Sequence, residues 1–327
     1  MPTNYMLVDG NSLGHFYNNA QKLSVGSLEV QAIFGFLRGL RQQMAFYQSF
    51  QPVVLWDGAS WRKTKLASYK ENRDRAETKN EIKLLKMKDA YKIQAPYIKK
   101  ALRFLGVPQV FALNMEADDL GAILTDRYAA QGGKIVLLTG DKDWLQLVGE
   151  NVVWRDFANE RLINLTLMNK EGTMTRFEEQ TGVKTTREFV EVKALSGDSG
   201  DNVPGVGGIG EKGAIEFIKT YGSFASFTNQ VIFEKTIDYK KLPKKFRDLI
   251  DDETKAIAFA RNIALMDLRT PERPAPMNLQ VDKGEASFEK FRRFCDLLLF
   301  ESITKHLDEW VRVFPAFRDR VPVQEAA

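Results

Sequence analysis

YMLVDG (residues 5–10) is a run of four apolar residues closed by Asp-Gly, and this arrangement recurs along the chain. PVVLWDG (52–58) and KIVLLTGD (134–141) repeat it, each an apolar run that ends at an aspartate. Short apolar runs bounded by turn residues predict buried β-strands, whereas apolar spacing of three and four across residues 30–50 predicts a helix. Strands separated by helices form a mostly parallel central sheet with helices on both faces. We therefore predict an α/β fold.

The aspartates that close these runs indicate a site, because the carboxyl ends of parallel strands meet at one edge of the sheet. Six more acids lie at predicted strand ends or helix starts, and the whole set is Asp9, Asp57, Glu116, Asp118, Asp119, Asp141, Asp143, Asp198 and Asp201. Any one of them could simply cap a helix. Nine converging carboxylates would repel one another, and divalent cations remove that repulsion. Oxygen ligands without His or Cys favour two or more Mg²⁺ or Mn²⁺ ions, which could clamp the attacking and leaving oxygens of a phosphodiester.

The composition excludes several other classes of site. The 327 residues are 44% hydrophobic and 28% charged, as in an ordinary soluble globular protein. Cys295 is the only cysteine, and His15 and His306 are the only histidines, so disulfides, cysteine metal clusters and histidine-rich zinc sites are not expected. The chain enters a strand at once and has no apolar run of about 18 residues, so we expect neither a signal peptide nor a membrane span. A cytoplasmic monomer is predicted.

A basic segment follows the second predicted strand. Residues 61–100 contain thirteen Lys and Arg against five Asp and Glu, a net charge of +8 in a chain whose total is +4. Such a segment on an otherwise acidic chain indicates a polyanionic partner, although a solvated helical face is the alternative. Residues 61–79 are polar without a clear period. Residues 80–105 show a helical pattern, in which Pro96 is expected to kink the helix or to start a new one.

A glycine-rich segment supplies the second half of the predicted site. It reads GDSGDNVPGVGGIGEKGAIEFIKTYGSF (197–224). Its glycines permit tight turns and close approach of the backbone to a bulky anion, and the helix that begins at EKGAIEF offers its N-terminal amides to a phosphate. The pattern fits a helix–hairpin–helix that binds the backbone of duplex DNA without reading bases. It is neither the G-x-G-x-x-G fingerprint that follows a strand nor a loop with a Walker lysine.

Six motifs, in their order along the chain, resemble those of flap endonucleases: LVDGN, VLWDG, SYKENRD, EADD, TGDKD and GDSGDNVPGVGGIGEKGA. The chain is most similar to the 5′-nuclease domain of bacterial DNA polymerase I and to stand-alone bacteriophage 5′-nucleases. The resemblance covers about residues 5–224, with weaker likeness to about residue 270. It implies a structure-specific, metal-dependent 5′→3′ exonuclease and flap endonuclease that hydrolyses DNA to 5′-phosphate and 3′-hydroxyl products. No polymerase domain follows, so the stand-alone type is expected.

The resemblance also implies roles for single residues. One metal is held by the acids that match Asp9, Asp57, Glu116, Asp118 and Asp119, and the other by those that match Asp141, Asp143, Asp198 and Asp201. Cations that contact the scissile phosphate match Lys70, Arg73 and Lys193, and Tyr69 matches an aromatic ring on which a terminal base stacks. Further DNA contacts are expected from Lys63, Lys65, Gly205, Gly207, Gly208, Gly210 and Lys212. A potassium ion at the hairpin maps to the carbonyls of Val203, Val206 and Ile209.

These expectations divide the chain into two domains. Residues 1–175 are predicted to form a PIN-like α/β nuclease domain, with a helical arch at about 61–105 through which a 5′ single strand passes. Residues 176–327 are predicted to form a helical DNA-binding domain, with the helix–hairpin–helix at about 190–222 and C-terminal helices that include one over 288–313.

The predicted substrate is DNA with 5′ ends, flaps or nicks. Glu71 departs from the family pattern, since it places an acid in the basic motif where small residues are usual. A non-catalytic, structure-specific DNA-binding protein is the alternative function, in which the acids act only as helix caps. A PIN-type ribonuclease would be shorter and would lack the hairpin.

Overall fold

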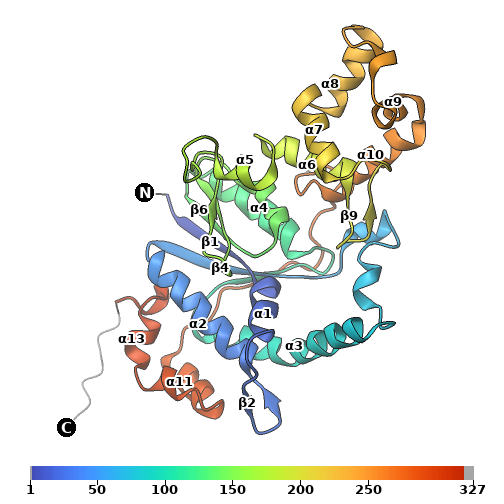
Figure 1. The fold of residues 1–327 in the computed structure, drawn as a ribbon. Helices are drawn as coiled ribbons and strands as arrows, with labels where there is room; N and C mark the ends of the chain where they lie inside the picture. The colour runs from blue at the N-terminus through green and yellow to red at the C-terminus, as the bar shows by residue number, and fades with distance from the viewer. Residues whose placement is uncertain (1, 320–327) are drawn as a thin grey trace, which may run out of the picture.

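The computed structural model describes residues 2–319, so Met1 and residues 320–327 of the predicted domains lie outside the described residues. Its centre is a seven-stranded sheet in the order β11-β5-β4-β1-β6-β7-β8 (Figure 1). The inner strands are parallel, and β11 and β8 at the two edges are antiparallel to their neighbours. The strands are β1 (Asn4–Asp9), β4 (Phe50–Trp56), β5 (Gln109–Phe111), β6 (Ile135–Leu138), β7 (Val152–Arg155), β8 (Leu162–Ile163) and β11 (Gln280–Asp282).

The three apolar runs of the sequence form the centre of this sheet. β1 lies between β4 and β6 and pairs in parallel with both. The pairing with β4 runs from Asn4 opposite Phe50 to Asp9 opposite Leu55, so the two strands end at the same edge. The predicted α/β class with a mostly parallel sheet is thereby confirmed.

Successive residues of β1 face opposite sides of the sheet and enter two separate apolar cores. Met6 and Val8 lie in the first core, to which α1 (Gly10–Asn18), α2 (Gln31–Phe46) and α3 (Lys79–Phe104) contribute. Leu7 lies in the second core, with residues of α4 (Ala117–Ala129), the 3₁₀ helix η3 (Lys142–Leu147) and the helices that follow the sheet. A short hairpin of β2 (Ser24–Val25) and β3 (Leu28–Glu29) connects α1 to α2. Burial on both faces explains why the central strands are continuous apolar runs.

The basic segment begins as two short 3₁₀ turns, η1 (Trp61–Thr64) and η2 (Glu71–Asp74), and continues as the long helix α3. A capping box fixes the start of α3, because the side chains of Thr78 and Glu81 accept hydrogen bonds from each other's backbone amides. Pro96 does not start a new helix, since α3 runs through it to Phe104. Packing of the last turns of α3 in the first core offsets the hydrogen bond that the proline cannot donate.

A helical region follows the sheet and is drawn in yellow and orange in Figure 1. It contains α5 (Arg176–Thr181), α6 (Thr186–Ser196), α7 (Glu211–Tyr221), α8 (Phe224–Thr228), η4 (Asn229–Phe233), η5 (Tyr239–Lys241), α9 (Lys244–Asp251) and α10 (Glu253–Met266). The packed helices α6 and α7 flank the glycine-rich loop, in which β9 (Gly197–Asp198) pairs with β10 (Val203–Pro204). This is the helix–hairpin–helix arrangement that the sequence predicts. None of the helices within residues 2–319 has the length and apolar character needed to cross a bilayer.

The last described segment returns to the sheet, which differs from the predicted division into residues 1–175 and 176–327. β11 pairs with β5, and residues of α11 (Phe288–Leu297), α12 (Glu301–Thr304), α13 (Leu307–Val311) and η6 (Pro315–Phe317) share the first core with α2 and α3. The single helix predicted over 288–313 is therefore wrong. Leu299, with a left-handed φ of 53°, lies at the break between α11 and α12. We propose that residues 280–319 belong to the nuclease part of the molecule.

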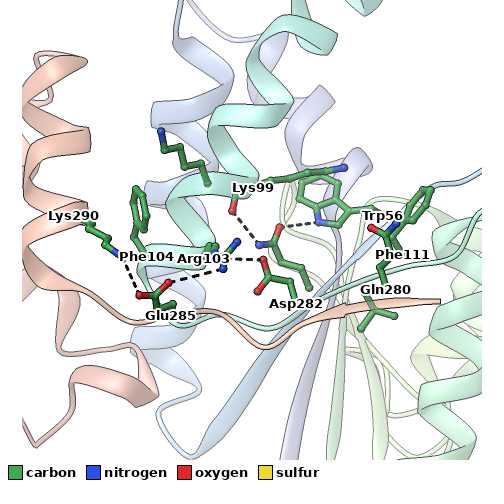
Figure 2. A pocket seen from close by; sticks show the side chains of 12 residues that line it. Trp56, Lys99, Arg103, Phe104, Phe111, Gln280, Asp282, Glu285 and Lys290 are labelled. Atoms are coloured by element: carbon green, nitrogen blue, oxygen red, sulfur yellow. Dashed lines mark hydrogen bonds and ion pairs between the residues drawn. The ribbon is translucent and has the colours of Figure 1, made fainter. Parts of the chain in front are cut away.

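A cavity of about 720 Å³ lies where this returning segment meets the end of α3 (Figure 2). Gln109 lines this cavity, and its side chain accepts a hydrogen bond from Trp56 Nε1 at 3.0 Å and donates one to the Lys99 carbonyl at 3.0 Å. Glu285, on the returning segment, pairs with Lys290 at 2.9 Å. The backbone amides of Glu285 and Ser287 donate to the carbonyls of Arg103 and Phe104 at 2.8 and 2.9 Å, and these bonds together with the shared apolar core attach the C-terminal segment to the end of α3.

Candidate active site

The aspartates at the ends of β1 and β6 are joined through one threonine. Asp9 caps α1 by accepting a hydrogen bond from the Ser12 amide at 2.9 Å, and its other oxygen accepts one from the Thr139 hydroxyl at 2.9 Å. The same hydroxyl accepts a hydrogen bond from the Asp141 amide at 3.0 Å. Asp141 in turn caps η3 by accepting from the Asp143 amide at 2.8 Å. The parallel register therefore brings three of the predicted acids to one edge of the sheet.

Asp57 connects the end of β4 to the EADD segment. Its carboxylate accepts hydrogen bonds from the Asn11 side chain at 2.6 Å and from the amide of Ala117, the first residue of α4, at 2.7 Å. Asp118 lies in the first turn of α4, where the Trp144 indole donates to its carboxylate at 2.6 Å. An acid in this position is favourable against the helix dipole, so part of its placement is structural.

The pKa values of these acids reflect their crowding. Burial and the charge of Asp57 raise the pKa of Asp9 to about 7. Burial and the charge of Asp143 raise the pKa of Asp141 to about 6. Burial and the charge of Asp141 raise the pKa of Asp118 well above its ordinary value. Each carboxylate therefore disfavours ionisation of its neighbours, and a bound cation would relieve this repulsion.

Two acids of the EADD segment already have a cationic partner. Arg62 is buried, with Nη2 at 2.9 Å from Asp119 Oδ1 and Nη1 at 3.0 Å from Asp119 Oδ2 and 3.1 Å from Glu116 Oε2. Asp119 is fully buried, and its Oδ2 atom also accepts a hydrogen bond from the Glu116 amide at 3.1 Å, which caps the start of α4. Both oxygens of Asp119 are thus engaged by donors in the protein alone, as are those of Glu116, and the role of Asp119 as a metal ligand stays a prediction. Nothing in the sequence distinguishes Arg62 from the other cations of the basic segment.

Lys70 and Arg73 lie beside the acids from the other side of the site. The Lys70 ammonium contacts the Glu116 carboxylate and lies 3.6 Å from Asp201 Oδ2, and Arg73 pairs with Asp201. Although burial opposes their ionisation, the charge of Glu116 holds the pKa of Lys70 above its ordinary value and that of Asp201 does so for Arg73. Lys70 has a left-handed φ of 57°, and its amide donates to the Asp201 carbonyl at 2.9 Å. The basic segment is thereby held against the hairpin.

Tyr69 does not have the exposed ring that base stacking requires. It is 3% exposed, and its ring packs with Val203 and Leu265. Its hydroxyl lies 2.8 Å from Asp201 Oδ2 and 3.1 Å from Glu116 Oε2. The structure therefore corrects the predicted stacking role: a buried ring offers no face to a base, and its hydroxyl positions two acids instead.

Lys193, on α6, lies between two acids of the second predicted group. Its ammonium contacts Asp143 and lies 3.0 Å from Asp198 Oδ2. Burial opposes ionisation of this pair, but the ammonium holds the pKa of Asp198 below its ordinary value, and the carboxylates hold that of Lys193 above its own. Asp198 Oδ1 also accepts from the amides of Gly200 at 2.8 Å and Asp201 at 3.1 Å. α6 thus delivers the predicted cation to the acidic edge.

The predicted metal ligands converge on one region without yet surrounding one point. Within residues 2–319, no three His, Cys, Asp or Glu side chains are grouped as the ligands of a single ion. The ammonium groups of Lys70 and Lys193 lie among the acids instead. The donor set nevertheless fits hard divalent cations, since it consists of carboxylate oxygens without imidazole or thiolate. A small cavity of about 10 Å³ at this edge is lined by acids of both predicted groups, Asp118, Asp143, Asp198 and Asp201.

Two further lysines predicted to contact DNA are exposed at the start of the basic segment. These are Lys63 and Lys65, of which Lys65 forms a surface ion pair with Glu272 at 2.8 Å. Exposed pairs of this kind contribute little to stability, so the pair could be exchanged for a phosphate contact. Asn72, in the basic motif, donates to the Ser199 carbonyl at 2.8 Å and so joins the basic segment to the hairpin.

The hairpin has the backbone geometry that its glycines predict. Gly207 and Gly208 have φ of 83° and 76°, a region that favours glycine. A Cβ on Gly205 would lie 2.5 Å from the Ser196 carbonyl oxygen, so only glycine fits between the loop and α6. Gly210 is the N-cap of α7, and Lys212 is exposed in its first turn. Their contacts with DNA stay a prediction.

One of the three predicted potassium ligands, the Val206 carbonyl, already has a cationic partner. Lys255, on α10, donates to the carbonyl oxygens of Val206 and Gly207, each at 2.9 Å. The side chains of Val203, Val206 and Ile209 are buried in the two cores of this region. Because an ammonium group takes a carbonyl that the potassium prediction requires, the hairpin does not fit that ion as predicted.

An acidic edge on a parallel sheet, a basic segment across it and a glycine-rich hairpin beside it define the class of 5′-nuclease folds. Residues 4–181 match the 5′-3′ exonuclease N-terminal resolvase-like domain, and residues 184–287 match the 5′-3′ exonuclease C-terminal SAM fold. A 5′-3′ exonuclease of Aquifex aeolicus is 34% identical over 227 residues, which are 68% of this chain and 71% of that protein. The chain belongs to the 5′-3′ exonuclease family.

Two further comparisons extend over most of the chain. DNA polymerase I of Chloroflexus aurantiacus is 28% identical over 307 residues, which are 91% of this chain but only 29% of the polymerase. The D15 protein of T5, crystallised with metal ions, has a TM-score of 0.62 at 23% identity, and the match covers 94% of this chain and 99% of that protein. At this identity the T5 protein supports the fold, and the residue roles are argued from the site itself.

Proposed function

We propose that the protein is a structure-specific, divalent-metal-dependent 5′→3′ exonuclease and flap endonuclease that hydrolyses DNA phosphodiesters. One observation carries the proposal. Acids from five segments far apart in the sequence meet at one edge of the sheet, with the cations Lys70, Arg73 and Lys193 among them. Membership of the 5′-3′ exonuclease family supports this activity.

The proposed ligands of Mg²⁺ or Mn²⁺ are Asp9, Asp57, Glu116, Asp118, Asp119, Asp141, Asp143, Asp198 and Asp201. Two ions or more suit a set of this size, because Mg²⁺ keeps much of its water and takes few carboxylates. The raised pKa values of Asp9 and Asp141 support the assignment, since burial and a neighbouring carboxylate disfavour the charged form of each, which a bound cation would stabilise. Bound ions would lower the pKa of an attacking water molecule and offset the charge on the leaving oxygen.

Three cations of the site are proposed to assist the bound metal ions in the reaction. Lys70, Arg73 and Lys193 are each paired with carboxylates in the protein alone. Divalent ions that occupy those carboxylates would leave the three cations available to the scissile phosphate and its developing charge. A water oxygen then bonds to phosphorus as the bond to the 3′-oxygen breaks. The attacking water gives up a proton and the leaving 3′-oxygen takes one up, so the products are a 5′-phosphate and a 3′-hydroxyl.

The proposed substrate is DNA with 5′ ends, flaps or nicks, bound by a cytoplasmic monomer. The net charge of +8 over residues 61–100 suits a single-stranded 5′ end, and the loop at Gly207 and Gly208 suits the backbone of the adjoining duplex. These contacts would bind DNA by structure and charge rather than by base sequence.

The test is cleavage of labelled flap, nicked and single-stranded DNA with Mg²⁺ and with EDTA. We expect cleavage only with Mg²⁺, and Asp141→Asn should lower turnover by about 100-fold or more while flap binding persists. Asp126→Asn, on the exposed side of α4, is the matched control and should cleave normally. Cleavage by Asp141→Asn at the unmodified rate would refute the metal assignment, and binding without any cleavage in Mg²⁺ would favour the non-catalytic alternative.

A further inference from the structure

The glycine-rich hairpin receives polar side chains from α10. Lys255, in the first turn of that helix, places its ammonium 2.9 Å from the carbonyl oxygens of both Val206 and Gly207. Two turns further along, the Asn262 side chain donates to the Pro204 carbonyl at 2.8 Å. Three carbonyls of a four-residue stretch of the loop are thus satisfied by donors from one helix.

Carbonyls of consecutive residues that converge on one point create a local negative potential, which suits a cation. A lysine ammonium carries three N–H donors and a full charge, so it can satisfy both carbonyls and still leave one donor free. The charge is fixed in place, because α10 is held to the hairpin independently: Asn262 is fully buried and also donates to the Ala194 carbonyl on α6 at 2.9 Å.

We propose that Lys255 is the built-in cation of the hairpin, so that the loop keeps its shape and binds the DNA backbone without potassium. A free monovalent ion would need the oxygens that the ammonium now contacts. The Lys255 ammonium lies 3.3 Å from the position that a Cβ on Gly207 would occupy. The charge is therefore close to the glycines that are predicted to contact the DNA backbone. The DNA-binding part of this inference rests on the proposed function, whereas the part on loop stability does not.

The experiment compares the unmodified protein with Lys255→Met, which keeps the length of the side chain without its charge. Lys134→Met is the control, because it removes the same charge from an exposed side chain. Lys134 precedes β6, at the opposite end of that strand from the acids. Binding of a fluorescent 5′-flap DNA is measured in EDTA, at equal concentrations of potassium, sodium or tetramethylammonium chloride. Thermal unfolding midpoints are measured in the same three salts without DNA.

We expect the unmodified protein to bind equally in all three salts, and Lys255→Met to bind about tenfold more weakly than Lys134→Met. The unfolding midpoint of Lys255→Met should be about 2–4 °C lower, as for the loss of a partly buried polar contact in a domain of this size. The inference is overturned if the unmodified protein binds DNA threefold or more tightly in potassium, or if Lys255→Met equals Lys134→Met in both measurements.

Failure of the proposed function is seen separately. If the unmodified protein does not bind flap DNA, the nuclease proposal fails, and the midpoints alone decide the inference. Equal midpoints of the unmodified protein in potassium and sodium, with a lower midpoint for Lys255→Met, would then support it. A midpoint of the unmodified protein that rises in potassium alone would refute it.

Discussion

Arg62→Met is the substitution whose effect the structure defines most sharply. The Arg62 side chain is 3% exposed, and it donates to Asp119 through two nitrogens, to Glu116, and to the Leu265 carbonyl at 2.6 Å. Methionine keeps most of the apolar volume but provides none of these donors. Asp119 would remain as a fully buried carboxylate with only the Trp61 indole at 3.3 Å and the Glu116 amide at 3.1 Å as donors.

Removing one partner of a buried ion pair leaves an uncompensated charge, which costs about 3–5 kcal/mol of unfolding free energy. The double variant Arg62→Met/Asp119→Leu removes both charges, and apolar replacements of buried pairs are often close to neutral. The loss in the double variant should therefore be smaller than the sum of the two single losses, by about 2 kcal/mol. Lys22→Met is the control, because Lys22 pairs with Glu29 on the surface at 78% and 30% exposure, where such pairs contribute at most about 1 kcal/mol.

Urea unfolding followed by tryptophan fluorescence measures the unmodified protein and four variants: Arg62→Met, Asp119→Leu, the double variant and Lys22→Met. A loss below about 1 kcal/mol for Arg62→Met, or a double variant whose loss equals the sum of the single losses, would show that the pair does not hold the EADD segment as argued. We also expect Arg62→Met to lose DNA cleavage, since Glu116 and Asp118 are positioned by the same turn. Retention of full cleavage in a folded Arg62→Met variant would contradict that link between stability and activity.

Four further outcomes are expected. Lys193→Met should lower the turnover of flap DNA by about 100-fold or more with little change in its binding, and equal losses in binding and turnover would argue for a merely structural lysine. In EDTA, folding raises the pKa of Asp9 from 3.8 to about 7, so between these pH values the folded protein holds a proton that the unfolded chain releases. The unfolding free energy should therefore fall as the pH rises from about 4 to about 7. Urea titrations across pH should show a smaller fall for Asp9→Asn. Gly205→Ala should destabilise the protein by about 1–3 kcal/mol, because its Cβ would meet the Ser196 carbonyl at 2.5 Å, and an unchanged urea midpoint would show that the loop can shift. Lys212→Met should weaken DNA binding several-fold and lower the salt dependence by about one charge, as a titration with sodium chloride would show.

Local pattern was sufficient for the sheet and for the gathering of its acids. The apolar run of β1 and those of β4 and β6 each end at or near an aspartate, and parallel strands necessarily end at one edge. The turn of the hairpin was equally predictable, since glycine permits the left-handed φ that Gly207 and Gly208 adopt. These features depend on periodicity and on single residues, which a sequence displays directly.

Partner choice depended on the tertiary structure. Thirteen cations of the basic segment are alike in sequence, yet packing buries Arg62 against Asp119 and brings Lys70 to Glu116. Tyr69 was expected to meet a base and is buried instead, because its hydroxyl finds two carboxylates and its ring a small apolar core. Long-range contacts of this kind are decided by shape and by the cost of leaving a buried charge unpaired.

The sequence by itself determined the central strands and the acids that stand at their ends, because these follow from local chemistry. Only the folded chain decided that residues 280–319 return to the sheet and that Lys255 reaches the hairpin. The pairing of β11 with β5 and the hydrogen bond from the Lys255 ammonium to the Val206 carbonyl both join residues that are far apart in sequence. Local periodicity does not indicate which distant groups will form hydrogen bonds with each other.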